Sequence, residues 1–390
     1  LYPAGDMVYS AGGQAHLFSS ADPEVVNRHF RWMKKYNIDG VYLQRFVNRN
    51  NGGGNGKSEF VLDNVRKAAA AEGRVWAIEY DVSGLDGSNP EGSDIPYQLE
   101  TMTNDWNYLV NECGILDDPR YLHENGKPVL FIWGFATANN ISTPAEADPV
   151  ISWFADQGLY LIGGVAKNKI DNSEWVPVLS KYDQLLEWME KDHLDLVDLK
   201  STLDGLGVKM LPHAWPGFSW HNLKKYPFPS TYTPRAGGDF YWTRLFNAID
   251  VGADQLFLGM FDEYDEATAI MPMSNTAPDT YDDGAGTAWG HYIDNEGLDP
   301  FWYLRLSGAA REILNGQRTL SSALPAESEL TATAYSGDDA TVYLGSNDVS
   351  DELAHIQLPD GITAGHFVAN HTCRTNAGTY LYFDIDDAFR

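Results

Sequence analysis

Four carboxylates stand within five residues directly after an apolar run, at Asp262, Glu263, Asp265 and Glu266. An apolar run that stops at acidic residues is typical of a buried parallel strand whose carboxyl end opens into a site. Strand alternation makes Glu263 the first polar group on its face. Glu266 is near enough to share its pocket if the chain turns between them. Two carboxyls in a partly apolar pocket can hold different pKa values, as glycoside cleavage requires. An acidic surface loop is the alternative.

Other polar and aromatic residues fall at the ends of further predicted strands. We predict that they line one substrate pocket, with Trp220 in a following loop: Tyr9, Tyr42, Arg45, Glu79, Tyr80, Asp81, Trp133, His213, Trp215 and Trp220. This mixture suits a neutral, polyhydroxylated ligand, because aromatic rings stack on the apolar faces of sugar rings. We expect Trp133, Trp215 and Trp220 to stack in this way, and packing in the core is the alternative for each.

Metal and nucleophilic chemistry have less support in the sequence. Glu79, Asp81 and His213 could bind a metal, but no His-Glu-x-x-His or His-x-His spacing occurs. The loop 86–94 does not match the calcium-loop pattern. No Gly-x-Ser-x-Gly is present, and Cys113 falls on a predicted helix without a paired base. We therefore expect neither a metal nor a cofactor.

Charge and composition restrict the partners. The chain of 390 residues carries 27 Lys and Arg against 55 Asp and Glu, a net charge of −28. Such a field repels nucleic acid and anionic membranes. No apolar run is long enough to span a membrane, and two cysteines make no disulfide scaffold. We expect a monomer that binds carbohydrate, does not bind nucleic acid, and is secreted, periplasmic or at the cell surface.

Alternating strands and helices must position these side chains. The predicted strands are 7–10, 38–46, 74–81, 127–135, 159–165, 208–215, 256–263 and 287–293. The predicted helices are 22–33, 61–72, 97–112, 145–157, 239–251 and 300–314, with further helical patterns at 182–191 and 196–206. Repetition of this kind predicts an α/β fold, a (β/α)8 TIM barrel. A doubly wound open sheet is the rival, but no Gly-x-Gly-x-x-Gly follows the first strand.

The pattern changes near Gly316. Beyond it, short alternating runs at 331–335, 340–344, 353–358, 366–370 and 379–385 are separated by Gly, Asp and Asn. They predict a small antiparallel, β-sandwich-like domain. The predicted domains are therefore a catalytic barrel, residues 1–318, and a C-terminal β domain, residues 319–390.

The acidic stretch also resembles a known family. Residues 261–270 are similar to the Trp-Asn-Glu-Trp-His-Glu-Gly-Thr-x-Ile signature of glycoside hydrolase family 99, the endo-α-mannosidases. They resemble still more a family 99-like, family 71-like group of bacterial proteins often labelled xylosidase/arabinosidase, with Phe-Asp-Glu-x-Asp-Glu-Gly-Thr-Ala. Further similar stretches are 77–80, 127–132 with Tyr121, 216–223 and 235–242. The resemblance covers about residues 7 to 315.

The resemblance implies roles for the two glutamates. Glu266 matches the family's general acid/base, and Glu263 matches the residue that assists through the sugar 2-hydroxyl, which implies a retaining glycoside hydrolase. The chain departs from the signature at Asp262, Asp265 and Ala267, where the family has Asn, His and Gly. Two alternatives stay open. One is an inverting hydrolase like the family 71 α-1,3-glucanases, and the other is a non-catalytic sugar-binding barrel.

Overall fold

The structure is a computed structural model that describes most of the α/β region. The described residues are 2–9, 14–46, 57–82, 95–135, 143–188, 196–220, 232–263, 266–272, 281–282, 296–331, 364–366 and 372–374.

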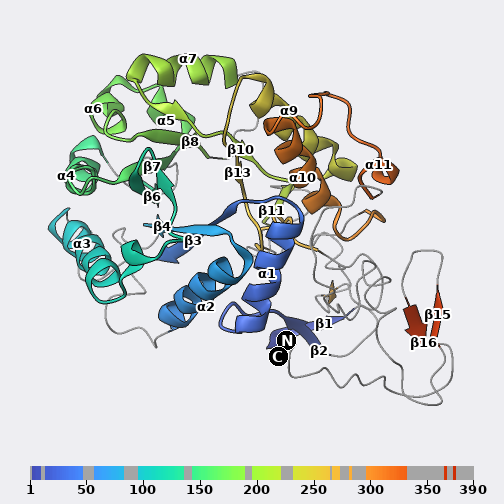
Figure 1. Ribbon diagram of the computed structural model, residues 1–390. Coiled ribbons are helices and arrows are strands. Elements are labelled where there is room, and N and C mark those ends of the chain that lie inside the picture. Colours follow the sequence, from blue (N-terminus) through green and yellow to red (C-terminus); the bar gives the residue numbers. More distant parts are fainter. Residues whose placement is uncertain are drawn as a thin grey trace.

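A curved sheet of parallel strands forms the centre of the molecule, and helices surround it (Figure 1). In spatial order its strands are β3 (Gly40–Phe46), β4 (Val75–Asp81), β6 (Lys127–Trp133), β7 (Tyr160–Val165), β8 (Gln184–Glu187) and β9 (Lys209–Met210). Beyond β9, β10 (His213–Ala214) pairs in parallel with β13 (Phe257–Leu258). The short β5 (His123–Glu124) pairs antiparallel with β6. Spatial order follows chain order, as in a (β/α)8 barrel. The predicted α/β architecture with a parallel sheet is confirmed.

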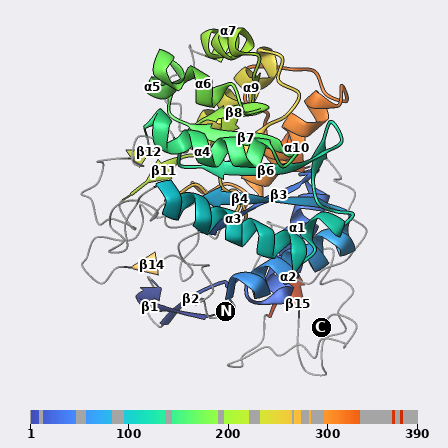
Figure 2. The ribbon, with the colours of Figure 1, turned by 90° about the vertical axis from the view of Figure 1, so that its left-hand side faces the viewer.

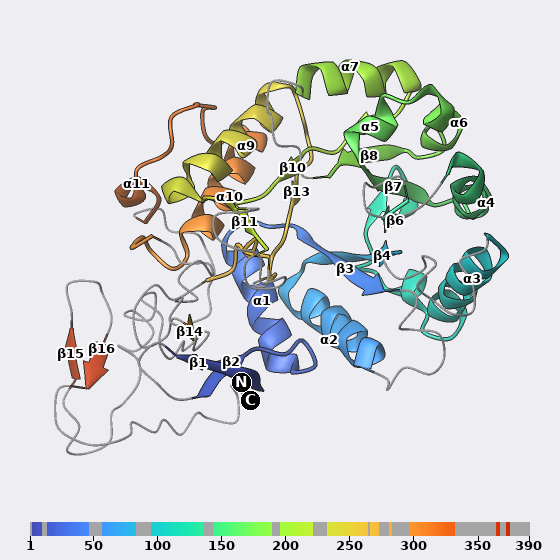
Figure 3. The same ribbon diagram turned by 180° about the vertical axis from the view of Figure 1, so that it is seen from behind.

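The helices form an outer layer around this sheet (Figures 1 and 3). They are α1 (Pro23–Lys35), α2 (Lys57–Glu72), α3 (Ile95–Asn111), α4 (Pro144–Ala155), α5 (Lys167–Ile170), α6 (Val176–Leu179), α7 (Leu196–Leu206), α9 (Asp239–Asp250), α10 (Trp302–Leu314) and α11 (Glu327–Thr331). The first and last of the long helices meet, since Trp32 and Tyr36 of α1 both contact the ring of Phe301, at 6.0 and 5.9 Å. In the part of the chain that the structure describes, no strand pairs with the outer edge of β3 or of β13.

Local signals place several helix ends correctly. The Asp22 carboxylate accepts a hydrogen bond from the Glu24 amide, and Pro23 occupies the first turn of α1, as predicted. Before α10, the Asp299 carboxylate accepts from the Phe301 amide, and the helix ends at Leu314 before Gly316, whose φ is +70°. These ends depend on local chemistry, which a sequence contains.

The predicted first barrel strand is wrong. β1 (Tyr2–Tyr9) pairs antiparallel with β2 (Gln14–Leu17) and β14 (Tyr281–Asp282), in a small sheet apart from the parallel one (Figure 2). Residues 7–10 form a short alternating run, and alternation does not distinguish parallel from antiparallel pairing. Tyr9 therefore does not lie at the end of a parallel strand.

Three further strands differ from the prediction. The helical pattern over 182–191 is wrong in its first half, because Gln184–Glu187 is β8, paired in parallel with β7 and β9. The predicted strand 208–215 is interrupted between β9 and β10 at Pro212, which has no amide hydrogen to donate. The run 256–263 is a strand only over Phe257–Leu258, and an irregular loop begins at Gly259.

The C-terminal prediction is largely outside the described residues, as is the predicted strand 287–293. Only β15 (Ala364–His366) and β16 (Thr372–Arg374) are described, and they pair antiparallel. The segment 317–331 packs on the α/β body: Arg318 bonds to Glu312 of α10, and Leu330 is fully buried beside that helix. The division into domains at 318/319 and the β-sandwich-like domain stay predictions.

Among the described helices, none combines the length and the apolar character needed to cross a membrane.

Candidate active site

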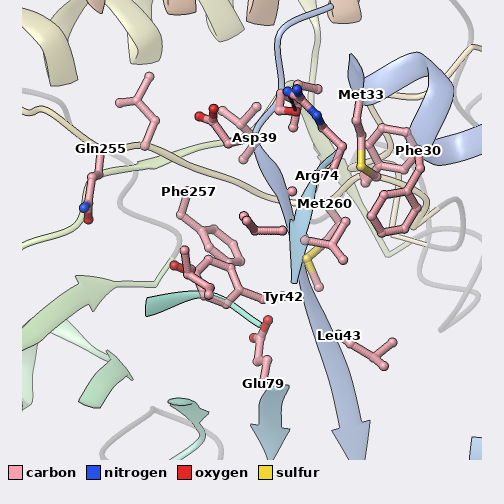
Figure 4. A pocket seen from close by; sticks show the side chains of 18 of the residues that line it. Phe30, Met33, Asp39, Tyr42, Leu43, Arg74, Glu79, Gln255, Phe257 and Met260 are labelled. Carbon is pink, nitrogen blue, oxygen red and sulfur yellow. Dashed lines mark hydrogen bonds between the residues drawn. The ribbon is translucent and has the colours of Figure 1, made fainter. Parts of the chain in front are cut away.

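The carboxyl ends of the parallel strands bring inward-facing side chains together around a cavity of about 810 Å³ (Figure 4). Neighbouring strands present Tyr42 and Gln44 from β3 and Glu79 from β4, and the loop after β13 adds Asp262 and Glu263. The cavity also extends toward the amino ends of the strands, where Asp39, Arg74 and Gln255 line it. Glu79 and Glu263 both line this cavity.

Glu79 is the most buried carboxyl group that lines this cavity, with 3% of its surface exposed. Burial raises its pKa well above the usual value, and the nearby charge of Asp81 raises it further. Asp81 is itself fixed by the Gln44 side chain, whose Nε2 donates to Oδ2 at 2.7 Å. Glu79 is therefore a weaker acid than an exposed glutamate, and in its protonated form it can donate a hydrogen bond into the cavity.

Tyr42 forms an aromatic wall beside Glu79 (Figure 4). Its ring stacks on Phe257 at 5.8 Å and meets Phe131 edge-on at 5.5 Å. Burial raises the pKa of the Tyr42 phenol, and the charge of Glu79 adds to the shift. The cavity wall thus combines apolar ring faces with two polar groups, the Tyr42 hydroxyl and the Glu79 carboxyl group.

The described segments 259–263 and 266–272 carry the two predicted catalytic glutamates, Glu263 and Glu266. The amides of Thr268 and Ala269 donate to the Glu263 carbonyl, at 3.2 and 2.9 Å. Because these bonds span the turn, Glu263 and Glu266 belong to one folded unit. Both are half-buried. Glu263 lines the cavity, whereas Glu266 lies beside Trp220, whose indole Nε1 donates to Oε1 at 2.9 Å.

Asp262, the neighbour of Glu263, faces helix α1. Its Oδ2 lies 3.7 Å from Nδ1 of His29. The Asp262 side chain is 41% exposed. Burial together with the charge of Arg28 lowers the pKa of His29 to about 3. His29 also packs on Phe261 at 5.3 Å. A neutral imidazole therefore lies next to the loop.

Arg45 and Tyr80 lie on the other side of the sheet, toward the helices. The Arg45 guanidinium donates two bonds to Asp105 of α3, at 2.8 and 2.7 Å, and the Tyr80 hydroxyl donates to the same carboxylate at 2.7 Å. Residues at odd and even positions of a strand point to opposite faces. The structure therefore places this pair in the packing of strand against helix and not in the cavity.

Aromatic residues line the strand ends from β6 to β10. Trp133 meets Trp188 at 5.3 Å, and Trp188 stacks on His213 at 4.9 Å. Burial lowers the pKa of His213 to about 3, with the charge of Arg244 adding to it, so the imidazole is neutral. A methyl group on Gly259 would lie 2.4 Å from His213 Nε2, so glycine is needed for this close approach.

The predicted stacking tryptophans fall in different surroundings. Trp215 is 2% exposed and packs on Phe240 at 4.8 Å, with the Arg244 guanidinium 4.9 Å from its ring, so it is a core residue. Trp133 and Trp220 are half-buried at the strand-end face.

The sequence reading missed Trp188 and Gln44. Trp188 follows β8, and the helical assignment of 182–191 hid it. The signal was present, since Leu185 and Leu186 stand between polar residues and end at an acid and an aromatic, as the other strands do. Within the described residues, no three His, Cys, Asp or Glu side chains gather as metal ligands.

Comparison with known proteins adds evidence on the fold. No protein-family model matches the chain, and a search of curated proteins finds no match. A solved structure of the family 99 endo-α-mannosidase from Bacteroides thetaiotaomicron, in complex with BIS-TRIS-propane, matches with a TM-score of 0.61 and 17% identity, over 81% of this chain and 90% of that chain. The fold is similar to that of glycoside hydrolases.

Two further solved structures agree. Another structure of the Bacteroides thetaiotaomicron endo-α-mannosidase gives a TM-score of 0.61 at 18% identity, over 80% of this chain and 84% of that chain. A glycoside hydrolase-like protein gives 0.51 at 15% identity, over 81% and 90%. At these identities the similarity concerns the fold, and the roles of individual residues depend on the site itself.

Proposed function

We propose that the protein is a glycoside hydrolase that cleaves an oligosaccharide or polysaccharide with retention of configuration. The observation that carries the proposal is the loop 259–272, which presents Glu263 and Glu266 at the carboxyl end of β13 in a fold similar to that of endo-α-mannosidases. In such barrels, chemistry takes place at the carboxyl ends of the strands.

In the proposed mechanism the two glutamates divide the work. Glu263 removes the proton of the substrate 2-hydroxyl, and this oxygen attacks the anomeric carbon of its own sugar. Glu266 protonates the leaving glycosidic oxygen as the bond to the anomeric carbon breaks. Glu266 then takes a proton from water, whose oxygen attacks the anomeric carbon. The bond from this carbon to the 2-oxygen breaks, and Glu263 returns its proton to the 2-oxygen, which restores both carboxyl groups to their starting forms. Two displacements at one carbon give net retention.

The cavity supplies the binding surface in this proposal. The Tyr42 ring offers an apolar face, and protonated Glu79 can donate to a sugar hydroxyl or ring oxygen. The net charge of −28 fits an exported protein with a neutral or cationic substrate. We propose a secreted, periplasmic or cell-surface location. We also propose that the protein is a monomer.

The test is hydrolysis by purified protein, first on a panel of α-linked plant, fungal and algal polysaccharides, scored by new reducing ends. Glu266→Gln should lose most cleavage of a poor leaving group and keep more on an activated aryl glycoside, which needs little protonation. Glu263→Gln should fail on both substrates, and a 2-deoxy substrate should resist the unmodified protein. Glu174→Gln, which changes an exposed carboxyl in the turn 173–175, is the matched control.

Product stereochemistry separates the proposal from its alternatives. A product of inverted configuration, or full activity of Glu263→Gln, would favour the inverting family 71-like reaction. Oligosaccharide binding without any release of reducing ends would instead favour a sugar-binding barrel.

A further inference from the structure

Two loops are joined by hydrogen bonds beside Glu266. The first follows β10 and contains the ribbon β11 (Phe218–Ser219) and β12 (Tyr232–Thr233), and the second is the loop 259–272. The Ser219 amide donates to the Glu266 carbonyl at 2.9 Å. The Arg235 guanidinium donates to the carbonyls of Ala267 and Ala269, at 3.3 and 2.5 Å. The backbone directly after the Glu266 side chain is therefore held from outside its own loop.

Arg235 can do this because it is anchored in the core. It is 5% exposed, and its guanidinium lies 4.3 Å from the centre of the Tyr303 ring of α10. A buried guanidinium has no competing water, so its bonds to carbonyl oxygens fix a position. With the backbone fixed, the side chain of Glu266 is oriented by what its carboxyl group touches.

That contact is the Trp220 indole, with Nε1 at 2.9 Å from Oε1 of Glu266. The Trp220 ring is itself packed edge-on against Phe218 of β11 at 5.4 Å. An indole N–H can only donate. Oε1 of Glu266 therefore accepts a hydrogen bond from Trp220.

We propose that Trp220 is a positioning residue for the acid/base glutamate: it holds the carboxyl group through Oε1 and stabilises the carboxylate that forms when the proton leaves. The inference rests on the proposed function, in which Glu266 is the acid/base. It differs from the stacking role predicted from the sequence, because it uses the N–H and not the ring face.

The chemical step shows why this contact would affect the rate. The carboxyl proton of Glu266 passes to the glycosidic oxygen while the bond between that oxygen and the anomeric carbon breaks, and the bonding electrons stay on the leaving oxygen. Glu266 becomes an anion in the same step. A hydrogen bond to an anion is stronger than one to a neutral acid. The Trp220 bond therefore strengthens along the reaction and lowers the barrier.

Trp220→Phe removes the N–H and keeps a ring. We expect kcat on a poor leaving group to fall by about tenfold or more, with KM little changed and with activity on an activated aryl glycoside largely kept. The basic limb of the pH profile should move up by about one pH unit, because the carboxylate loses a stabilising donor. Trp153→Phe, a half-buried tryptophan of α4, is the control and should change neither. A rise in KM alone, with no shift of the limb, would return Trp220 to sugar stacking.

A second measurement does not depend on catalysis. In ¹H–¹⁵N spectra, the indole signal that disappears in Trp220→Phe identifies Trp220. In the unmodified protein this signal should move with pH as Glu266 titrates, and the movement should vanish in Glu266→Gln. A pH-independent indole signal would overturn the inference even in an active hydrolase. A coupled signal in a protein that cleaves no glycoside would keep the contact and refute the proposed function.

Discussion

The contact between Arg45 and Asp105 gives a direct test of which sheet face each strand-end residue occupies. The two side chains are 4% and 3% exposed, and they are joined by two bonds of 2.7 and 2.8 Å. Arg45→Met would leave the Asp105 carboxylate buried, with only the Tyr80 hydroxyl among these partners. Breaking one side of a buried, bidentate pair costs about 3–5 kcal/mol of unfolding free energy. Tyr80→Phe leaves the ion pair intact and should cost about 1–2 kcal/mol.

Urea unfolding at neutral pH measures these differences. The double variant Arg45→Met with Asp105→Leu should recover part of the loss, because no charge is then left buried without a partner. Sugar affinity and turnover per folded molecule should stay unchanged in all of these variants. If Arg45→Met unfolds like the unmodified protein but binds sugar at least tenfold more weakly, the assignment of Arg45 to the helix-facing side is refuted.

Three further outcomes follow from the geometry. Because burial raises the pKa of Glu79, its contribution to stability is complete below about pH 4.3, the unfolded value, and is lost as the pH rises through the raised folded value. Relative to the unmodified protein, Glu79→Gln should therefore gain unfolding free energy as the pH rises above about 4.3. An equal pH slope in both proteins would contradict this. Trp215→Ala should cost about 3–5 kcal/mol of unfolding free energy, whereas Trp133→Ala should mainly weaken sugar binding in calorimetry; the reverse pattern would exchange their roles. The pKa of His213 is lowered to about 3, so unfolding free energy is lost as the pH falls from about 6.5 toward 3. His213→Gln should reduce this loss of stability in acid. An unchanged acid transition would show that His213 is not buried in the neutral form.

The sequence predicted those parts of the fold that depend on local chemistry. The Asp22 and Pro23 start of α1 and the Gly316 end of α10 follow from capping, which involves only neighbouring residues. β8 was missed because four residues are too few to display a period, and their strand geometry comes from pairing with β7 and β9. Residues 2–9 formed a different sheet for the same reason, since pairing partners are distant in sequence.

The site was predictable at the level of strand ends and not at the level of strand faces. Glu79 and Glu263 reach one cavity as expected. Tyr80 is next to Glu79 in sequence and Arg45 is next to Gln44, yet both point to the helices. Their direction is set by a one-residue alternation whose register a single sequence leaves open. The irregular loop after Leu258 also breaks the alternation from which the position of Glu263 was argued.

The hydrogen bonds between the two loops have a consequence for protein engineering. The Ser219 amide and the Arg235 guanidinium belong to one loop, and the carbonyls that they bind belong to the other. If only one of the two loops were replaced by that of another barrel, each of these hydrogen bonds would lose its donor or its acceptor. Replacing the loop 259–272 alone could leave Arg235 buried without its acceptors. The two loops should therefore be transferred together. Recombination between related barrels should give folded progeny when both are inherited from the same parent.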